Sequence, residues 1–498
     1  MKSLTAVSIV LLSALVAPAS AAPATLIEAV KAGDRAAVTR LLAAKADVGA
    51  TEADGTTALH WAVRADDEQM TALLVRAGAN AKAANRYGVT PLTLAAKTGN
   101  AAIVELLVRA GADPNTASPE GETVLMTAAR SGSVAAVKAL LARGANPNAK
   151  ESWLEQTALM WAAADNHAAI VSVLVENGAD INARAKAMTG PPRLARQQGV
   201  AAQASHSNFP RGGFSPLLFA AQLGAMEAVG ALATAGADLN LPDPDGITPL
   251  AMAIINGNYD VAALLVNKGA NVNATDRVGR SPLFFAADMH TLEWLFSRPV
   301  PRPTGDLDSV DTVKLLLDKG ANVNARLTGR PFILHHNATG NRTIAEGATA
   351  FMKAATTSDV ALMKILLERG ADPSIPTRNN TTALMAAAGL NWVDISSLGT
   401  EDASIDAITL LLDRGVDINA QNDLGETAVH GAAQRGADKV IRFLASRGAK
   451  VDVKNEEGRT PLDEAVGQAN EANDDNVRRP ERKSTQALLR ELMAGAKP

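Results

Sequence analysis

A short pattern recurs along this chain with a period of about 33 residues. An apolar run followed by Gly-Ala-Asp, Gly-Ala-Asn or a close variant places its glycine at ten positions: Gly78, Gly111, Gly144, Gly178, Gly236, Gly269, Gly320, Gly370, Gly415 and Gly448. Five of the nine steps between these glycines keep the period to within one position, and the other four are longer. A fixed period of this length predicts a stack of repeated helical units, interrupted by insertions, rather than three globular domains.

Each repeat carries signals for two helices. Thr90 can cap a helix whose first position is Pro91, where the missing proline N–H costs nothing. Gly99 ends this inner helix, and an apolar run then forms an outer helix that ends at Gly111. The segment up to the next such threonine predicts a hairpin turn. Its glycine supplies a positive φ, which we expect at the three equivalent positions Gly88, Gly121 and Gly246.

The period and the Gly-x-Thr-Pro-Leu motif resemble the ankyrin repeat, and His60 and His430 stand where that family has a histidine. The resemblance covers roughly residues 24–495. It implies a mainly α ankyrin-repeat solenoid of about 12 helix-turn-helix units with connecting β-hairpin turns. In that family the motif histidine braces neighbouring turns, and the residue after it packs between helices. We therefore expect the aromatic residues at that position to lie in the core: Trp61, Trp161, Phe219 and Phe285.

The repeats divide the chain into regular and inserted segments. We expect an N-terminal capping repeat at 22–53 and a C-terminal capping repeat at 455–498 that contains an inserted loop at 467–483. Regular repeats occupy 54–182 and 213–454, separated by a basic inserted loop at 183–212. Three further insertions interrupt the second block: 291–309, 327–346 and 391–403. Insertions in a solenoid map to loops, which are often part of a binding face but are also tolerated at little cost.

The segment 1–21 reads as a secretory signal peptide. Lys2 precedes an uncharged, mostly apolar run at 4–16, and Ala19-Ser20-Ala21 gives a cleavage signal, so we predict a cut after Ala21. The apolar run is too short for a membrane span. The chain contains no cysteine, which suits an exported protein that needs no oxidative folding. These features predict a periplasmic or secreted bacterial protein with no membrane span after cleavage.

Composition and motifs argue against several kinds of chemistry. Without cysteine there is no thiol nucleophile, Cys-ligated zinc or iron–sulfur cluster. The formal net charge of −4 does not suit a general nucleic-acid binder. The motifs for nucleotide binding, zinc proteases, calcium loops and serine hydrolases are absent, and the adjacent His335 and His336 fall short of a metal site. We therefore predict a non-catalytic protein without cofactor or metal.

Three cations occupy the same place in successive repeats. Arg64, Lys97 and Arg130 follow one another at exact repeat spacing, each just past the alanines of an inner helix. In the ankyrin family this position faces the concave groove and contacts partners. Arg86 and Tyr87, on an intervening turn, could extend the row. The alternative is that each cation only offsets the dipole of its own helix.

The inserted loop at 183–212 is a second basic feature. It has no acidic residue and five cations, so its net charge is +5: Arg184, Lys186, Arg193, Arg196 and Arg211. This loop is either a binding element or a solvated linker.

Together these features predict a protein–protein interaction scaffold of the periplasm that binds through its concave groove and hairpin tips. One alternative is a binder of polyanions or of the cell envelope surface through the two basic features. A second alternative is metal binding or enzymatic activity in the inserted loops. The partner and the oligomeric state do not follow from the sequence. Repeats nine and ten carry long insertions and weaker motifs, so we expect residues 327–403 to open before residues 54–178.

Overall fold

The computed structural model describes residues 25–188, 211–290, 304–329, 345–390, 399–466 and 481–495. The expected signal peptide lies outside these residues. Contacts divide the chain into two compact parts, Met1–Asn146 and Pro147–Pro498, which we call the N-terminal unit and the C-terminal unit. None of the described helices is both long enough and apolar enough to cross a membrane.

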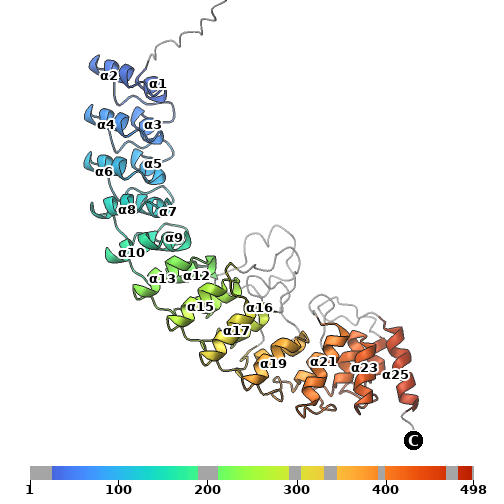
Figure 1. Cartoon of the computed structure of the whole chain (residues 1–498). Coiled ribbons are helices and arrows are strands. Elements are labelled where there is room, and N and C mark those ends of the chain that lie inside the picture. Colours follow the sequence, from blue (N-terminus) through green and yellow to red (C-terminus); the bar gives the residue numbers. More distant parts are fainter. Residues whose placement is uncertain are drawn as a thin grey trace, which may run out of the picture. The chain divides into compact units, whose positions relative to one another are not determined.

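The N-terminal unit contains four pairs of helices. In Figure 1 the first helices of these pairs form one row and the second helices form another row beside it. In every repeat we call the first helix of the pair inner and the second helix outer. The pairs are α1 (Leu26–Lys31) with α2 (Arg35–Ala43), α3 (Ala58–Arg64) with α4 (Glu68–Arg76), α5 (Pro91–Thr98) with α6 (Ala101–Arg109), and α7 (Val124–Arg130) with α8 (Val134–Leu141). Inner helices α3, α5 and α7 pack against one another in that order.

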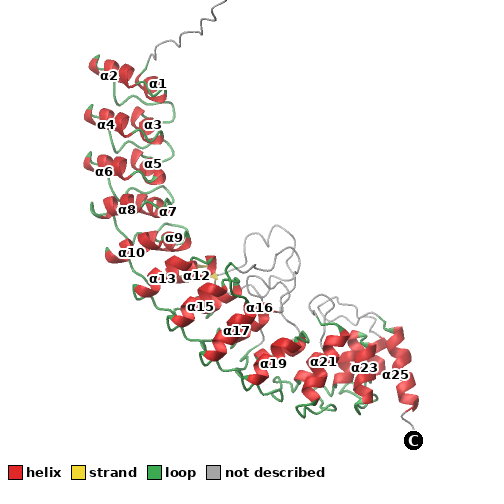
Figure 2. Ribbon diagram, in the orientation of Figure 1, coloured by secondary structure: helices red, strands yellow, loops and turns green. Residues whose placement is uncertain are grey.

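The C-terminal unit contains eight further pairs, so the described residues hold twelve repeats, as predicted. Figure 2 shows that helices joined by loops make up nearly all of it. The pairs are α9 (Ala158–Ala164) with α10 (Ala168–Glu176), α12 (Pro216–Leu223) with α13 (Met226–Thr234), α14 (Pro249–Ile255) with α15 (Tyr259–Asn267), α16 (Pro282–His290) with α17 (Ser309–Asp318), α18 (Ala350–Thr356) with α19 (Val360–Glu368), α20 (Ala383–Ala388) with α21 (Glu401–Leu412), α22 (Ala428–Arg435) with α23 (Asp438–Ser446), and α24 (Pro461–Val466) with α25 (Lys483–Gly495).

The inner helices begin and end where the repeat motif predicts. The Thr90 hydroxyl accepts a hydrogen bond from the Thr93 N–H at 3.2 Å, Pro91 is the first helical residue, and Gly99 ends α5 with φ 73°. The turn glycines also have the expected positive φ, 75° at Gly88 and 86° at Gly246. At Gly246 a Cβ atom would lie 2.9 Å from the Asp276 Cα of the next repeat. A side chain at this position is therefore disfavoured both by the positive φ and by this short contact.

The connecting turns contain very little regular strand. Some are closed by a single β-bridge, as between Ala117 and Thr123. Within the described residues the only strands are β1 (Ala187–Met188) and β2 (Arg211–Gly212), which pair antiparallel. The two ends of the basic insertion are therefore held together by backbone hydrogen bonds, and 183–212 is not a loop over its whole length.

Asparagine side chains join consecutive repeats on the turn side. The Asn115 amide donates to the Gly144 carbonyl oxygen at 3.1 Å, and its side-chain oxygen accepts from the Asn146 N–H at 2.8 Å. The same two-bond bridge links four other pairs of repeats, through Asn148, Asn273, Asn324 and Asn419. We call this series the asparagine ladder.

Three outer helices begin inside, or at the end of, segments that we expected to be inserted loops. Asp308 caps α17, which starts at Ser309, and Thr400 caps α21, which starts at Glu401. Helix α25 likewise starts at Lys483. Helices α17 and α25 thus begin at the last residue of the expected insertions, and α21 begins two residues before the end of 391–403, where a capping side chain and early acidic residues favour a helix start.

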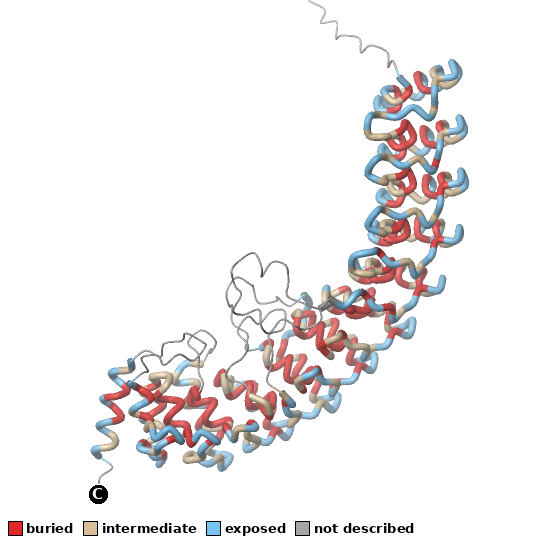
Figure 3. The backbone as a smooth tube through the Cα atoms, turned by 180° about the vertical axis from the view of Figure 1, so that it is seen from behind, coloured by how far each residue is buried: buried red, intermediate tan, exposed pale blue. Residues whose placement is uncertain are grey.

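The core lies between the two rows of helices in each repeat (Figure 3). In α5 the side chains of Leu92, Ala95 and Ala96 are fully buried, because alanine lets the neighbouring inner helices approach closely. In the C-terminal unit some inner helices are buried on all sides: every residue of α14 and of α20 is buried. The inner helices of the N-terminal unit keep an exposed side.

Candidate functional site

Arg64, Lys97 and Arg130 lie in register on three consecutive inner helices. Each comes seven residues after the threonine that caps its helix, and each side chain is exposed. Because α3, α5 and α7 pack side by side, the three residues form one line, which we call the inner cation row. Whether this row binds a partner remains a prediction.

The helices that carry the inner cation row have no acidic side chains. Helices α3, α5 and α7 contain no aspartate or glutamate, and each has one Lys or Arg, in its last turn. Within the part of the chain that the structure describes, no carboxylate lies within 4 Å of the Lys97 ammonium. The row is therefore a positive line on helices that carry no negative charge.

The Trp61 ring lies beside this row and makes cation–π contacts with two cations. The Arg64 guanidinium lies 5.4 Å from the centre of the indole ring and the Lys31 ammonium lies 4.2 Å from it. The indole N–H donates to Glu52 at 2.9 Å, and Glu52 also pairs with Lys31. These contacts explain why Trp61 is only half-buried, where we had expected a core residue.

The other aromatic residues at this position differ along the chain. Phe285 is 2% exposed, as expected for a core residue, but Trp161 and Phe219 are half-buried. The indole N–H of Trp161 donates to Gln156 at 2.9 Å, and the ring of Phe219 meets that of Phe214 edge to face at 5.4 Å. Trp161 and Phe219 nevertheless pack against the buried cluster of Met160, Ala183 and Ala185, so both rings lie at the edge of the core. Only Trp61, which contacts two cations, departs from the expectation.

The turn before α5 carries Arg86 and Tyr87 at its tip. Tyr87 is 58% exposed, and the Arg86 guanidinium lies 4.7 Å from the centre of its ring. The Arg86 N–H donates to the Asp54 carbonyl oxygen at 2.8 Å, which ties this tip to the preceding turn. The pair forms an exposed, positively charged aromatic tip in the N-terminal unit.

The cations of the basic insertion do not form one described patch. The Arg184 guanidinium donates to the Gly213 carbonyl oxygen at 3.1 Å, so it helps to close the base of the insertion. Lys186 is exposed, and Arg211 lies in β2 with its side chain outside the described residues. Arg193 and Arg196 also lie outside them. Among the described residues, Arg184 has a structural role that the charge pattern did not predict.

The inner cation row is confined to the N-terminal unit. From the fifth repeat to the eleventh, the residue seven places after the capping residue is neutral or acidic: Ala164, Gln222, Ile255, Asp288, Thr356, Gly389 and Gln434. Ile255 is buried, and so is the rest of α14. An exposed cationic inner surface is thus a property of repeats two to four.

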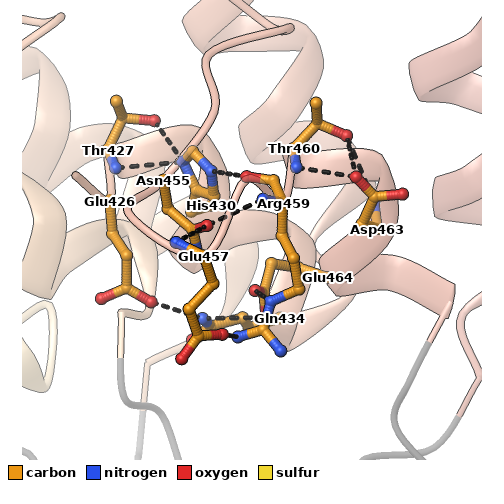
Figure 4. A network of polar contacts seen from close by, with 10 residues as sticks. All are labelled: Glu426, Thr427, His430, Gln434, Asn455, Glu457, Arg459, Thr460, Asp463 and Glu464. Atoms are coloured by element: carbon orange, nitrogen blue, oxygen red, sulfur yellow. Dashed lines mark hydrogen bonds and ion pairs between the residues drawn. The ribbon is translucent and has the colours of Figure 1, made fainter. Parts of the chain in front are cut away.

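The motif histidines brace consecutive repeats, as the resemblance implied. His430 Nδ1 accepts from the Thr427 N–H at 3.1 Å, and its Nε2 donates to the Arg459 carbonyl oxygen at 3.2 Å (Figure 4). Burial lowers the pKa of the His430 imidazole, and His60 has the same arrangement with Thr57. The neutral ring, protonated at Nε2, satisfies both contacts.

A buried acidic network near the C-terminal end was not predicted. The Gln434 amide donates to Glu426 at 3.1 Å and to Glu464 at 3.2 Å, and the Arg459 guanidinium lies 3.0 Å from Glu464 (Figure 4). The side chain of Glu464 is 4% exposed. The repeat motif does not specify these side chains, so the sequence pattern gave no signal for the network. It connects the last two repeats through their inner helices and turns.

His290 joins three helices through two 3.0 Å contacts. Its Nδ1 contacts the Ser309 hydroxyl at the start of α17, and its Nε2 contacts Asp359, the cap of α19. The Asp359 hydrogen bond raises the pKa of His290. The order Ser–His–Asp resembles a catalytic triad, but Ser309 is only 7% exposed, so we interpret the cluster as a structural link. The described residues contain no group of His, Asp and Glu suited to hold a metal ion.

Comparison with known families places ankyrin repeats over most of the chain. A model for three consecutive ankyrin repeats matches residues 26–118, 101–185, 217–327 and 397–477, and a single-repeat model matches 346–378.

Individual relatives match over shorter stretches. The mouse B-cell lymphoma 3 protein homolog is 33% identical over 118 residues, 24% of each chain. The E3 ubiquitin-protein ligase KEG of Arabidopsis thaliana is 34% identical over 125 residues, 24% of this chain and 7% of the relative. The human SH3 and multiple ankyrin repeat domains protein 2 is 26% identical over 182 residues, 32% of this chain and 9% of the relative. The match spans a quarter or less of each relative, and their names share no single activity.

Proposed function

Because the chain belongs to the ankyrin-repeat family, whose repeats generally mediate protein–protein interactions, we propose that it is a non-catalytic interaction scaffold of the bacterial periplasm. Its partner is another protein, not a nucleic acid, and contacts the inner helices and turn tips of the N-terminal unit. The three relatives have different names and cover little of this chain, so they do not identify the partner.

One observation carries this proposal: the inner cation row is exposed and in register on helices that have no acidic residue. The same charge recurs at one position of three packed repeats, next to the half-buried Trp61. Arg and aromatic residues of this kind are enriched at protein interfaces.

The periplasmic location rests on the sequence of residues 1–21. Sequencing the N-terminus of the protein isolated from a periplasmic fraction should give Ala22 as the first residue. Recovery of the uncleaved chain from the cytoplasm would overturn this part of the proposal.

Site-specific photocrosslinking tests the scaffold function. A photoreactive residue is placed at Lys97 on inner helix α5 or, as the control, at Arg109 on outer helix α6 of the same repeat; both positions are exposed. We expect a defined protein adduct from Lys97 in periplasm and none from Arg109. The same adduct from both positions, or none from either, would contradict binding through the inner helices.

The polyanion alternative is supported by the positive charge of the inner cation row. A polyanion would bind with a steep salt dependence and little dependence on the order of its charges. The experiment in the next subsection separates these two kinds of ligand.

A further inference from the structure

The inner cation row has a fixed spacing that its ligand must match. Arg64, Lys97 and Arg130 lie at the same position of three packed inner helices. Packed helices lie about 8–10 Å apart, so neighbouring cations of the row repeat at about that distance and the row spans about 20 Å. A ligand that contacts all three cations presents three negative groups at the same interval.

An extended acidic peptide meets this requirement. A polyproline II segment has three residues per turn and rises about 3.1 Å per residue, so every third side chain lies on the same edge at intervals of about 9 Å. In a β-strand the side chains of residues i and i+3 point to opposite faces. An acidic residue at every third position of a strand would therefore not place all the carboxylates on one side.

We propose that the inner cation row binds an extended acidic segment of a partner protein in which Asp or Glu recurs at every third residue. This inference rests on the proposed scaffold function and specifies its partner. Each carboxylate accepts hydrogen bonds from one cation of the row. Leu94, three residues before Lys97 in the same helix, is half-buried and supplies apolar surface beside the row.

An anionic membrane or polysaccharide is the less suitable ligand. Membrane-binding clusters typically contain four to eight basic residues close together. The described row has three, one per repeat, on helices without acidic residues. Charges spread over about 20 Å suit a linear ligand with matched spacing better than a dense negative surface.

The chain provides a matched control for charge. Arg76, Arg109 and Arg143 follow one another at close to repeat spacing on the outer side of the same three repeats, and all are exposed. Replacing each by Glu changes the net charge by the same amount as Arg64→Glu, Lys97→Glu and Arg130→Glu together. A difference between the two triple variants therefore reports position and not total charge.

The test measures binding of fluorescent peptides to the mature full-length protein by anisotropy. The first probe is a (Glu-Pro-Pro)n peptide of about fifteen residues, and the second has the same composition with its glutamates grouped at one end. The third probe is a vesicle that contains anionic phospholipid. Each is measured at about 50 and about 300 mM salt, with circular dichroism to check that the variants are folded.

We expect the regular peptide to bind the wild type at least about fivefold more tightly than the grouped peptide, and the inner triple variant to lose at least about tenfold in affinity. The outer triple variant should lose no more than about threefold. Equal binding of the two peptides, equal losses in both variants, or vesicle binding that depends on the inner row would each overturn the proposal. If the adduct at Lys97 still forms in a protein with Arg64→Glu and Arg130→Glu, the scaffold function stands and the acidic partner is wrong.

Discussion

His60 reaches from one repeat into the next, because its Nε2 lies 3.0 Å from the carbonyl oxygen of Val89. Its Nδ1 accepts from the Thr57 N–H at 3.2 Å, so both ring nitrogens are used when the ring is neutral. Burial is the main cause that lowers the pKa of His60, and the same holds for His430. The inter-repeat contacts of both histidines therefore depend on pH.

We predict that acid weakens the fold through these two histidines. In the unfolded chain a histidine takes up a proton below about pH 6.5, whereas the folded ring takes it up only at lower pH, so stability falls as pH drops below about 6.5. At pH 7, His60→Leu should cost about 1–3 kcal/mol, because the Val89 carbonyl and the Thr57 N–H lose their partner. Chemical unfolding should show that this cost shrinks at pH 5. A cost that stays constant would contradict the neutral ring.

His290 should show the opposite dependence. Its pKa is raised by Asp359, so the stabilisation from this pair is present below about pH 6.5 and is lost as pH rises through the raised pKa. The difference in melting temperature between wild type and His290→Gln should be larger at pH 6 than at pH 9. Asp359→Asn should remove that pH dependence, and additive effects of the two substitutions would show that the pair does not interact.

Asp243 is a buried carboxylate whose replacement should stabilise the protein. Burial raises the pKa of Asp243 to about 6, so its ionised form disfavours the fold at neutral pH by up to about 3 kcal/mol. Its Oδ1 accepts from the N–H groups of Asp245 and Ile247, a role that asparagine fills at Asn422 and Asn455. Asp243→Asn should raise stability at pH 7 and have little effect near pH 4, where the carboxyl is already protonated.

The equivalent residue of the next repeat is the control for Asp243. Asp276 pairs with the buried Arg280 at 2.7 Å. Asp276→Asn should therefore lower stability at pH 7 by about 2 kcal/mol, because it removes the negative partner of that guanidinium. If both substitutions stabilise the fold, the argument from burial and pairing fails.

Two glycines in helical and turn positions should respond oppositely to substitution. Gly246 has φ 86° and its Cβ would meet Asp276, so Gly246→Val should cost about 1–3 kcal/mol or more. Gly230 lies inside α13 with no atom within 4 Å of the Cβ position, so Gly230→Ala should add about 0.5–1 kcal/mol. Urea unfolding of both variants checks the sign of each change.

Local opening should be easiest in repeats nine and ten. The described amides of 327–403 should exchange their hydrogens faster than those of 54–178, because stability in a repeat array is roughly a sum of repeat and neighbour terms. Mass-spectrometric hydrogen exchange measures this directly. Equal protection in both regions would show that the insertions leave stability unchanged.

The inner triple variant also separates partner binding from helix stabilisation. If Arg64, Lys97 and Arg130 only offset helix dipoles, reversing all three charges should lower the melting temperature and leave a partner bound. If they serve a partner, stability should change by no more than about 0.5 kcal/mol for each residue while binding is lost.

The repeat pattern predicted the fold because its signals are local. The cap at Thr90, the glycine at Gly99 and the positive φ at Gly246 each follow from a few adjacent residues, and the structure has all three. The same signals, a cap followed by acidic residues, start α17 after Asp308 and α21 after Thr400, at the ends of two expected loops.

Contacts between side chains that are far apart in the sequence could not be predicted from these local signals. The link from His290 to Asp359 crosses inserted segments, and the link from Gln434 to Glu464 uses side chains that the motif does not specify. The position of the inner cation row was readable because the repeat period preserves it. The environment of Trp61 was not, since it depends on Lys31 from the preceding repeat.

The asparagine ladder has a consequence for how such a chain can evolve. Asn115 bonds to residues 29 and 31 positions ahead, whereas Asn273 makes the same two bonds to residues 47 and 49 positions ahead. The bridge thus tolerates extra chain between its ends. Duplication of a whole repeat, or growth of a segment between its helices, leaves every such bridge intact. During evolution this protein can therefore gain a repeat or a longer loop in a single genetic step. Selection can then act on the new surface, because the fold does not first need a compensating change.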